Sequence, residues 1–402
     1  MNSFFCSVEL LEHPELKDKP VAVAGRADAR HGIILAKNQL AKKAGVTTPE
    51  PIYQALQKCP DLVLLDPHHE KYQHYCNVIN HIYLQYTDLV EPFSVDESWL
   101  DVTGSLKLFG KTAKELADEI RQRVYKETGL TLSAGVSFNK TFAKMGSDYK
   151  KPYATTEITR DNYQELLWPL PAGDLFFVGK ASAARLRSLN IKTIGDIARA
   201  DEKLLANVFG KHGLEMKLSA NGADDDPVLA YDSEWKRKSV GNGITFRRDI
   251  SGADIRSAVG VISDRVAGRL RKYGLKAGGV KVDIKDPNFI SISRQKQLVS
   301  PTDLSSELAT AAMEIIEDNW YLDNPIRLIT ITGFKLYESG DPIEEQLNLF
   351  ETEEELAARD AAAAKEKQLE NTIDAIRKRM GSGAIVQGSL VGNDFGVIID
   401  DH

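Results

Sequence analysis

The segment Ser94-Val95-Asp96-Glu97-Ser98-Trp99-Leu100-Asp101-Val102-Thr103 decides the expected fold and chemistry, because it places two adjacent carboxylates inside an otherwise strand-like run. The run predicts a β-hairpin with Asp96 and Glu97 at its tip and a return strand that ends before Gly104. Neighbouring residues of a strand point to opposite faces, but at a turn both carboxylates can face one point. Such hard oxygen ligands suit Mg²⁺, whose coordination is usually completed by water and substrate phosphates. A solvated turn is the alternative interpretation of the same dipeptide.

Length and charge distribution set the next limits. A chain of 402 residues is long enough for about two to four domains. Residues 341–402 hold 14 acidic and 6 basic side chains, whereas residues 232–296 hold 15 Lys and Arg against 7 Asp and Glu. The overall net charge of −7 therefore hides a basic module beside an acidic tail, a pattern typical of nucleic-acid binding. A solvated basic face is the alternative.

The three cysteines, Cys6, Cys59 and Cys76, lack paired spacing, and no apolar stretch has the length of a signal peptide or a membrane span. We therefore expect a cytoplasmic protein with free thiols and no membrane segment.

Several histidines lie near Cys76 in the sequence: His68, His69, His74 and His81. They invite a zinc interpretation, but no CxxC or HxxxH spacing supports a tetrahedral site. Tyr72, Cys76, Ile79 and Tyr83 follow helical spacing instead. The segment is therefore predicted to be a helix with one buried face.

Short β runs at 20–24, 62–65, the hairpin and 132–136 alternate with helical segments up to about residue 165, which predicts an α/β sheet domain. A helical region follows over about 166–230. The basic module has candidate strands at 243–246, 279–284, 291–297 and 328–336, with a helix at 253–273. Beyond Gly340 the sequence predicts an acidic, Ala-rich helix over 352–380.

The stretch Phe176-Phe177-Val178-Gly179-Lys180 resembles the turn of a helix-hairpin-helix. In that device, backbone N–H groups at a helix N-terminus can hold a DNA phosphate. Lys180 and Lys211 favour this interpretation, and a plain helical hairpin is the alternative.

Three further segments accompany the acidic hairpin: Phe4-Phe5-Cys6-Ser7-Val8-Glu9, the run 32–46 that contains Gln39 and Lys42, and the run 139–152 that ends in Lys151-Pro152. Together, and in this order, they resemble the Y-family DNA polymerases, the translesion group. The resemblance extends from Met1 to about residue 340, and the combination is far more specific than any single segment.

The resemblance implies an α/β multidomain, right-handed polymerase. Palm and fingers would occupy 1–165, with the fingers at about 18–67, and the helix-hairpin-helix thumb would occupy 166–231. A β-rich, DNA-binding little finger would occupy 232–340, followed by an acidic tail at 341–402. The DNA-binding residues so implied are Gly179, Lys180, Lys211, Arg247, Arg248 and Lys281.

The resemblance also implies the active site. Asp96 and Glu97 match the catalytic carboxylates that bind two Mg²⁺ ions, with the backbone carbonyl of Met1 as a further ligand. Phe5, beside Phe4, matches the steric gate that excludes a 2′-OH. The remaining nucleotide-binding positions are Gln39, Lys42 and Lys151. Gln39 departs from the family's usual Tyr, and Tyr153-Ala154 departs from its usual Asn-Gly.

One departure concerns the first metal ligand, which the family places as an Asp immediately before the residue that matches Met1. We therefore expect a misplaced start or a truncation that also removes a palm strand, and low activity of this exact chain. The alternative is a catalytically silent accessory protein that binds DNA and the sliding clamp. A palm-like nucleotide cyclase would fit Asp96 and Glu97, but not the helix-hairpin-helix.

The peptide Gln346-Leu347-Asn348-Leu349-Phe350 places three apolar residues in a polar setting. It resembles the peptide that bacterial polymerases insert into the sliding clamp (the β subunit), with Gln346, Leu347, Leu349 and Phe350 as anchors. The expected partners are thus primer-template DNA, dNTPs and the clamp, and the expected state is a monomer. The expected function is low-fidelity, template-directed DNA synthesis across damage.

Overall fold

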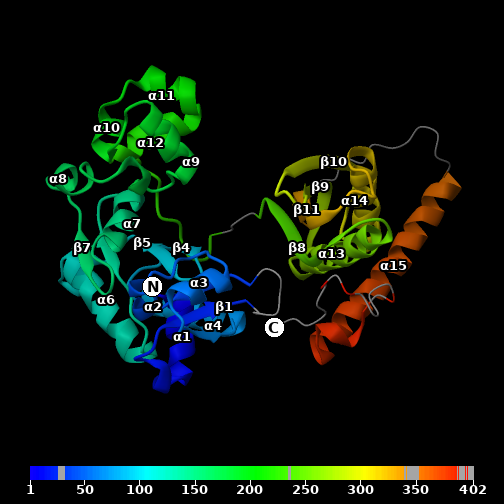
Figure 1. Cartoon of the computed structure of the whole chain (residues 1–402), viewed down its shortest axis with the longest axis horizontal. Coiled ribbons are helices and arrows are strands. Elements are labelled where there is room, and N and C mark those ends of the chain that lie inside the picture. Colours follow the sequence, from blue (N-terminus) through cyan, green and yellow to red (C-terminus); the bar gives the residue numbers. More distant parts are fainter. Residues whose placement is uncertain are drawn as a thin grey trace. The chain divides into compact units, whose positions relative to one another are not determined.

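The computed structural model describes residues 1–25, 32–233, 237–338, 341, 353–386, 388, 394 and 396. They form two compact units, one up to Ser233 and the other from residue 237 onward (Figure 1). Each unit has its own hydrophobic core.

The first unit begins with α1 (Phe4–Glu12) and a small sheet of strand order β2-β1-β3. The central strand, β1 (Val21–Ala24), is buried throughout; it pairs antiparallel with β2 (Ile34–Lys37) and parallel with β3 (Val63–Leu65). The short helices α2 (Gln39–Lys43) and α3 (Ile52–Lys58) add Ala41, Ile52 and Ala55 to the same small core.

The acidic hairpin lies in the next part of the unit. It pairs β4 (Val90–Ser94) with β5 (Glu97–Leu100), and the core of this region includes α4 (His69–Tyr83) and α6 (Ala113–Thr128). Helix α4 buries Tyr72, Cys76, Ile79 and Tyr83, as the sequence predicted. Strands β6 (Ala134–Val136) and β7 (Thr155–Glu157) form a parallel pair, and α7 (Lys140–Tyr149) packs against both. The short helix α5 spans Leu106–Phe109.

A cluster of short helices completes the first unit: α8 (Tyr163–Leu167), α9 (Lys180–Ser188), α10 (Ile194–Arg199), α11 (Glu202–Phe209) and α12 (Lys211–Ala220). Figure 1 shows them as a separate group at one end of the unit. Gly213 lets α12 approach α11, because a Cβ there would lie 2.3 Å from the carbonyl oxygen of Leu205.

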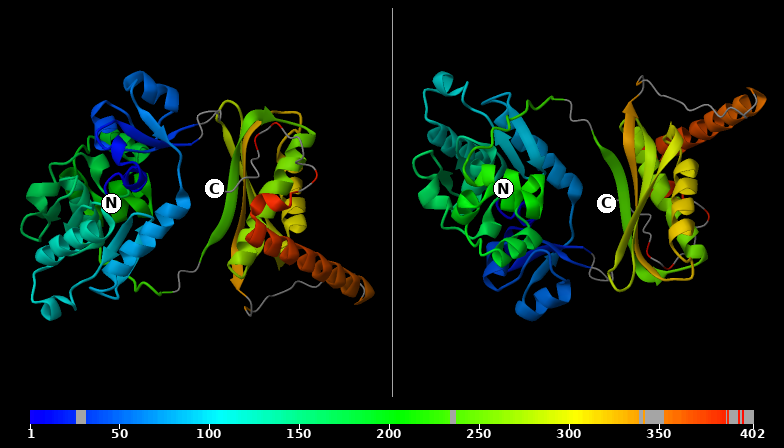
Figure 2. Two further views of the ribbon diagram at one scale, coloured as in Figure 1. Left: turned by 90° about the horizontal axis from the view of Figure 1, so that it is seen from below. Right: turned by 90° about the horizontal axis from the view of Figure 1, so that it is seen from above.

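The second unit is built on an antiparallel sheet of strand order β10-β9-β11-β8. Its strands are β8 (Ser239–Ile250), β9 (Leu275–Lys285), β10 (Ser291–Thr302) and β11 (Ile326–Glu338). Helices α13 (Ala253–Lys272) and α14 (Ser305–Asn319) cover one face of this sheet (Figure 2). The acidic segment forms α15 (Glu353–Met380), close to the predicted bounds.

The main elements were predicted, but several bounds differ. The return strand of the hairpin ends at Leu100, and the carboxylate of the next residue, Asp101, accepts a hydrogen bond from the Thr103 N–H. Strand β2 was not predicted, since its four residues carry no alternating pattern. Among the described residues, no helix combines the length and apolarity that a membrane crossing needs.

Candidate active site

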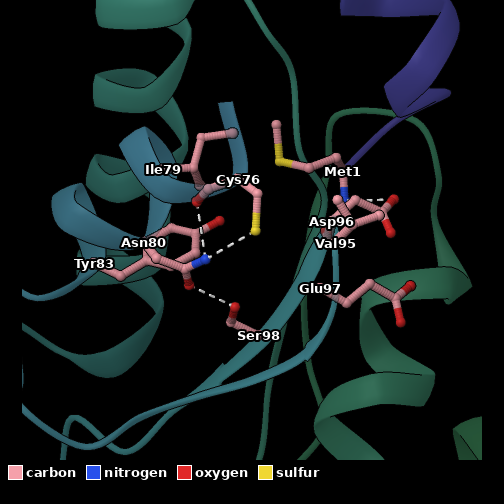
Figure 3. A pocket seen from close by; sticks show the side chains of 9 residues that line it. All are labelled: Met1, Cys76, Ile79, Asn80, Tyr83, Val95, Asp96, Glu97 and Ser98. Carbon is pink, nitrogen blue, oxygen red and sulfur yellow. Dashed lines mark hydrogen bonds and ion pairs between the residues drawn. The ribbon is translucent and has the colours of Figure 1, made fainter. Parts of the chain in front are cut away.

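The site is built around the turn between β4 and β5. Asp96 lies in the turn and Glu97 opens β5, and both carboxylates project to the same side of the hairpin, away from Asn80 and Ser98 (Figure 3). The hydroxyl of Ser94 donates to Asp96 Oδ1 at 3.0 Å. The shared direction is what the sequence led us to expect of a turn.

Met1 lies directly beside Asp96. Its α-amino nitrogen donates to the Asp96 carbonyl oxygen at 2.8 Å and lies 3.7 Å from Asp96 Oδ2 (Figure 3). Burial lowers the pKa of this amino group, although the charge of Asp96 acts in the opposite direction. Met1, expected to offer a backbone carbonyl to a metal, is thus next to the carboxylate pair.

Glu97 is held by Lys144, a residue that the sequence reasoning missed. Lys144 Nζ lies 2.7 Å from Glu97 Oε1 and 3.0 Å from Asp148 Oδ2. Burial alone would lower the pKa of Lys144, but hydrogen bonds with Glu97 and Asp148 outweigh burial and raise the pKa. The signal in the sequence was a lysine within the run 139–152, one turn before Asp148.

A cleft of about 540 Å³ opens beside these groups. Its lining includes Met1, Asp96, Glu97, Lys144 and Lys151, together with the acidic run 224–226. Lys151 forms an ion pair with Asp148, so the two lysines share one carboxylate. The cleft therefore brings two adjacent carboxylates and three lysines, Lys140, Lys144 and Lys151, onto one surface. Such an arrangement suits a polyanionic substrate held with a cation.

The oxygen donors at the turn are of the type that suits Mg²⁺, the metal that the resemblance implies. Among the residues that the structure describes, no group of three or more His, Cys, Asp or Glu could hold a metal ion. Asp96 and Glu97 nevertheless supply two hard oxygen donors on one side of a turn, next to Met1. Mg²⁺ is commonly held by one or two carboxylates with substrate phosphates and water, so this pair fits it.

The structure does not bring every predicted nucleotide-binding residue to the cleft. Phe4 is buried in the core, and Phe5 stacks on Tyr72 with ring centroids 4.0 Å apart. Gln39 and Lys42 lie exposed on α2. Of the five predicted nucleotide-binding residues, only Lys151 is among the described residues that line the cleft.

The turn that was predicted to bind a phosphate lies in the helical cluster, directly before α9. Gly179 is the N-cap of α9 and Lys180 is its first residue, while Lys211 opens α12 and lies 3.4 Å from Glu215. Phe177 has a φ of 67°, a strained value for a non-glycine residue, and the residue is 67% exposed. Its ring lies 4.0 Å from that of Phe176.

In the second unit, the predicted DNA-binding residues lie on the sheet. Arg247 is exposed on β8, while neighbouring Arg248 pairs with Asp254 at 2.7 Å and with Asp394 at 2.6 Å. Lys281 on β9 lies 3.1 Å from Asp283. The predicted clamp-binding residues, Gln346, Leu347, Leu349 and Phe350, lie outside the described residues.

The histidines near Cys76 have local partners. His68 Nδ1 lies 3.0 Å from the buried carboxylate of Glu9, and His81 Nδ1 lies 2.7 Å from the carbonyl oxygen of Asn77. Cys6, Cys59 and Cys76 are free and buried. The prediction of free thiols is thus confirmed.

Two family models match the chain. Residues 1–148 match the impB/mucB/samB family, and residues 237–349 match the C-terminal domain of the same family. A curated relative from Acetivibrio thermocellus, named DNA polymerase IV, is 41% identical, and the match covers 97% of this chain and 96% of that protein. DNA polymerase IV 1 of Bacillus subtilis is 36% identical over 97% of this chain and 92% of that protein.

A solved structure agrees with this assignment at the level of fold. A Y-family DNA polymerase chimera superposes with a TM-score of 0.74 at 23% identity, covering 84% of this chain and 97% of the chimera. The chain therefore belongs to the impB/mucB/samB family, and the expected resemblance to Y-family DNA polymerases is confirmed.

Proposed function

We propose that this chain is a template-directed DNA polymerase of the translesion type. The observation that carries the proposal is the pair Asp96 and Glu97, presented on one side of a tight turn into a cleft that also holds Lys144 and Lys151. Family membership supports the same conclusion, since the relatives are DNA polymerases by name. Accessory binding without catalysis would leave the convergence of these four side chains unexplained.

In this proposal Asp96 and Glu97, together with the backbone carbonyl of Met1, would hold two Mg²⁺ ions. When bound, such ions supply a lowered pKa for the primer 3′-OH and charge neutralisation for an in-line displacement. Lys151 faces the same cleft and neutralises the triphosphate, while Lys144 fixes the orientation of Glu97. Lys42 on α2 adds positive charge from the fingers region.

Sugar and base selection follow from the surroundings of the site. Phe5 is the proposed steric gate, and its stacking on Tyr72 gives the ring a firm support against a 2′-OH. Phe4 anchors the same helix in the core, and Gln39 takes the place of a triphosphate-contacting Tyr. An open cleft discriminates base shape weakly, so low fidelity and tolerance of damaged templates are expected.

The remaining assignments concern domains and partners. We assign palm and fingers to 1–165, thumb to 166–231, little finger to 232–340 and tail to 341–402. Primer-template DNA would contact Gly179, Lys180, Lys211, Arg247, Arg248 and Lys281. The α9 N-terminus at Gly179 and the basic side chains on the sheet support these contacts, because a helix N-terminus and basic side chains can each hold a DNA phosphate. The peptide 346–350 would bind the sliding clamp of a monomeric enzyme in the cytoplasm.

The test is Mg²⁺-dependent extension of a labelled primer on an undamaged and on a damaged template. The chain as printed is compared with a version that carries an upstream strand ending in Asp before Met1. Incorporation that chelation of Mg²⁺ abolishes, in either protein, supports the polymerase. DNA and clamp binding in both proteins without incorporation would replace it with the accessory function.

A further inference from the structure

Lys140 is a buried cation that the proposed mechanism does not use. It is the first residue of α7, and its side chain is 8% exposed. A cation at a helix N-terminus is opposed by the helix dipole, and burial adds a desolvation penalty. A lysine in this position therefore needs strong compensating contacts.

Two of these contacts hold the two strands of the acidic hairpin. Lys140 Nζ lies 2.6 Å from Glu91 Oε2 on β4 and 5.3 Å from the centre of the Trp99 ring on β5. The Lys140 carbonyl oxygen accepts a hydrogen bond from Trp99 Nε1 at 3.1 Å. Since Glu91 and Trp99 face each other directly in the β4–β5 register, one residue fixes a cross-strand pair.

The position of Lys140 on α7 also sets the position of Lys144, which contacts the catalytic turn. Lys144 follows Lys140 by four residues, a helical rise of about 6 Å. Glu97 precedes Trp99 by two residues on the same face of β5, a strand rise of about 6.6 Å. The helical rise and the strand rise are nearly equal. The contact of Lys140 with Trp99 therefore places Lys144 beside Glu97, with 2.7 Å between Lys144 Nζ and Glu97 Oε1.

The third contact reaches the segment that follows the helical cluster. Lys140 Nζ lies 2.8 Å from Asp226 Oδ2, and the preceding Asn139 donates to Asp224 Oδ1 at 2.7 Å. The same segment returns to the hairpin strand, since the Leu229 N–H donates to Glu91 Oε2 at 2.8 Å. The Asp226 side chain is 75% exposed, so this contact can open without uncovering a buried charge.

We infer that Lys140 is a positioning residue that sets the register between α7 and the catalytic hairpin and couples it to segment 224–229. The inference rests on the proposed function, because it assigns the positioned carboxylate a role in nucleotide transfer. Lys140 lines the same cleft, but its ammonium is held by Glu91 and Asp226, so we assign it an action through Lys144 and Glu97. The competing interpretation is an ion pair that only stabilises the fold.

The test compares Lys140→Met with the double variant Glu91→Gln/Lys140→Met. The single variant leaves Glu91 buried without its cation and is expected to lose stability. The double variant replaces both charges by neutral groups of similar size, which is often nearly neutral for stability. A positioning role predicts that the double variant regains the melting temperature but keeps a single-turnover incorporation rate about tenfold or more below the starting protein, with the dNTP Kd little changed.

A second measurement, ¹⁹F NMR of Trp99, reports the position of the hairpin and does not depend on catalysis. Trp99 is labelled as 5-fluorotryptophan, its ¹⁹F signal is assigned with Trp99→Phe, and the signal is expected to shift or split in both Lys140 variants. Asp226→Asn should shift the same signal less, because Glu91 still holds the lysine. Lys217→Met serves as the stability control, since Lys217 donates to the Ala200 carbonyl within the helical cluster and should leave both readouts unchanged.

The outcomes separate the two proposals. A double variant with restored stability, an unshifted ¹⁹F signal and a normal rate overturns the positioning role. An intact starting protein that incorporates no nucleotide, while the ¹⁹F signal shifts as expected, overturns the proposed polymerase but leaves Lys140 as the residue that seats the hairpin. Rescue of rate and signal by Lys140→Arg would further support the requirement for a cation.

Discussion

Lys140 in the first unit and Arg271 in the second unit are both buried cations, but they bind their carboxylates differently. Each meets one buried and one more exposed carboxylate: Lys140 meets Glu91 and Asp226, and Arg271 meets Glu370 and Asp374. Lysine offers a point charge, whereas the guanidinium of arginine offers a planar fork of donors. The guanidinium of Arg271 can therefore bind more acceptors at once than the ammonium of Lys140.

The Arg271 network is saturated and attaches the C-terminal helix. Arg271 donates to both carboxylate oxygens of Asp374, at 2.6 and 3.1 Å, and to the Asp303 carbonyl oxygen at 2.8 Å. Glu370 on α15 also accepts the backbone N–H of Ser305 at 2.8 Å, at the start of α14. A network of this kind fixes a helix in place, while the Lys140 network keeps one contact that can open.

The largest expected effect is on catalysis, and it should spare stability. Glu97→Gln removes a proposed metal ligand, so the single-turnover incorporation rate should fall by roughly 10³-fold or more. The melting temperature should stay within about 2 °C, because Glu97 is partly exposed and Lys144 keeps Asp148. Asp101→Asn is the matched control, a carboxylate near the same turn that lines the cleft and caps a loop. Equal losses in both variants would remove the special role of Glu97.

The acidic hairpin was predictable because the residues that specify it are neighbours in the sequence. Asp96 and Glu97 follow one another in the chain, and the strand pattern around them predicts the turn that presents both on one side. Lys144 was missed, because nothing in the sequence around a helical lysine indicates that it contacts Glu97, 47 residues earlier. Phe5 was found by resemblance, but its stacking on Tyr72 depends on how α1 packs on α4.

Arg271 marks the limit of sequence reasoning in the second unit. It is one of the 15 Lys and Arg in residues 232–296, the basic module for which nucleic-acid binding is predicted. The structure buries it against Glu370 and Asp374, about 100 residues later in the chain. The composition of the tail predicted an acidic helix, but the pairing of one arginine with two particular carboxylates arises from tertiary packing.

The second prediction concerns stability without catalysis. Arg271→Met leaves Glu370 buried beside an apolar side chain, so the free energy of unfolding should fall by about 3 kcal/mol. Urea denaturation measures the loss, and limited proteolysis should show new cleavage in α15 once its attachment weakens. The incorporation rate per folded molecule should not change.

Arg256→Met is the control on the same helix. Arg256 pairs with Glu317 through largely exposed side chains, so its loss should change the unfolding free energy by well under 1 kcal/mol. If Arg256→Met were as destabilising as Arg271→Met, burial would not be what distinguishes the Arg271 network.

A smaller, pH-dependent effect should come from Glu370. Burial raises the pKa of this carboxyl above 4.5, although Ser305 and Arg271 act in the opposite direction. Since the folded pKa exceeds the unfolded one, the stabilisation is complete below pH 4.5 and is lost as the pH rises through the folded pKa. The melting temperature of the starting protein minus that of Glu370→Gln should therefore decrease as the pH rises above 4.5. An increase would mean that Arg271 dominates and lowers the pKa.

The smallest effect is expected where a tail carboxylate meets an arginine at the surface. Asp394 lies 2.6 Å from Arg248, as short as the Asp374 contact of Arg271, but the Asp394 side chain is 71% exposed. Water and salt screen such a pair, and Arg248 keeps Asp254 at 2.7 Å when Asp394 is neutralised. Asp394→Asn should therefore leave the melting temperature unchanged at low and at high salt. A measurable loss that high salt removes would show that distance, rather than burial, ranks the ion pairs of the second unit.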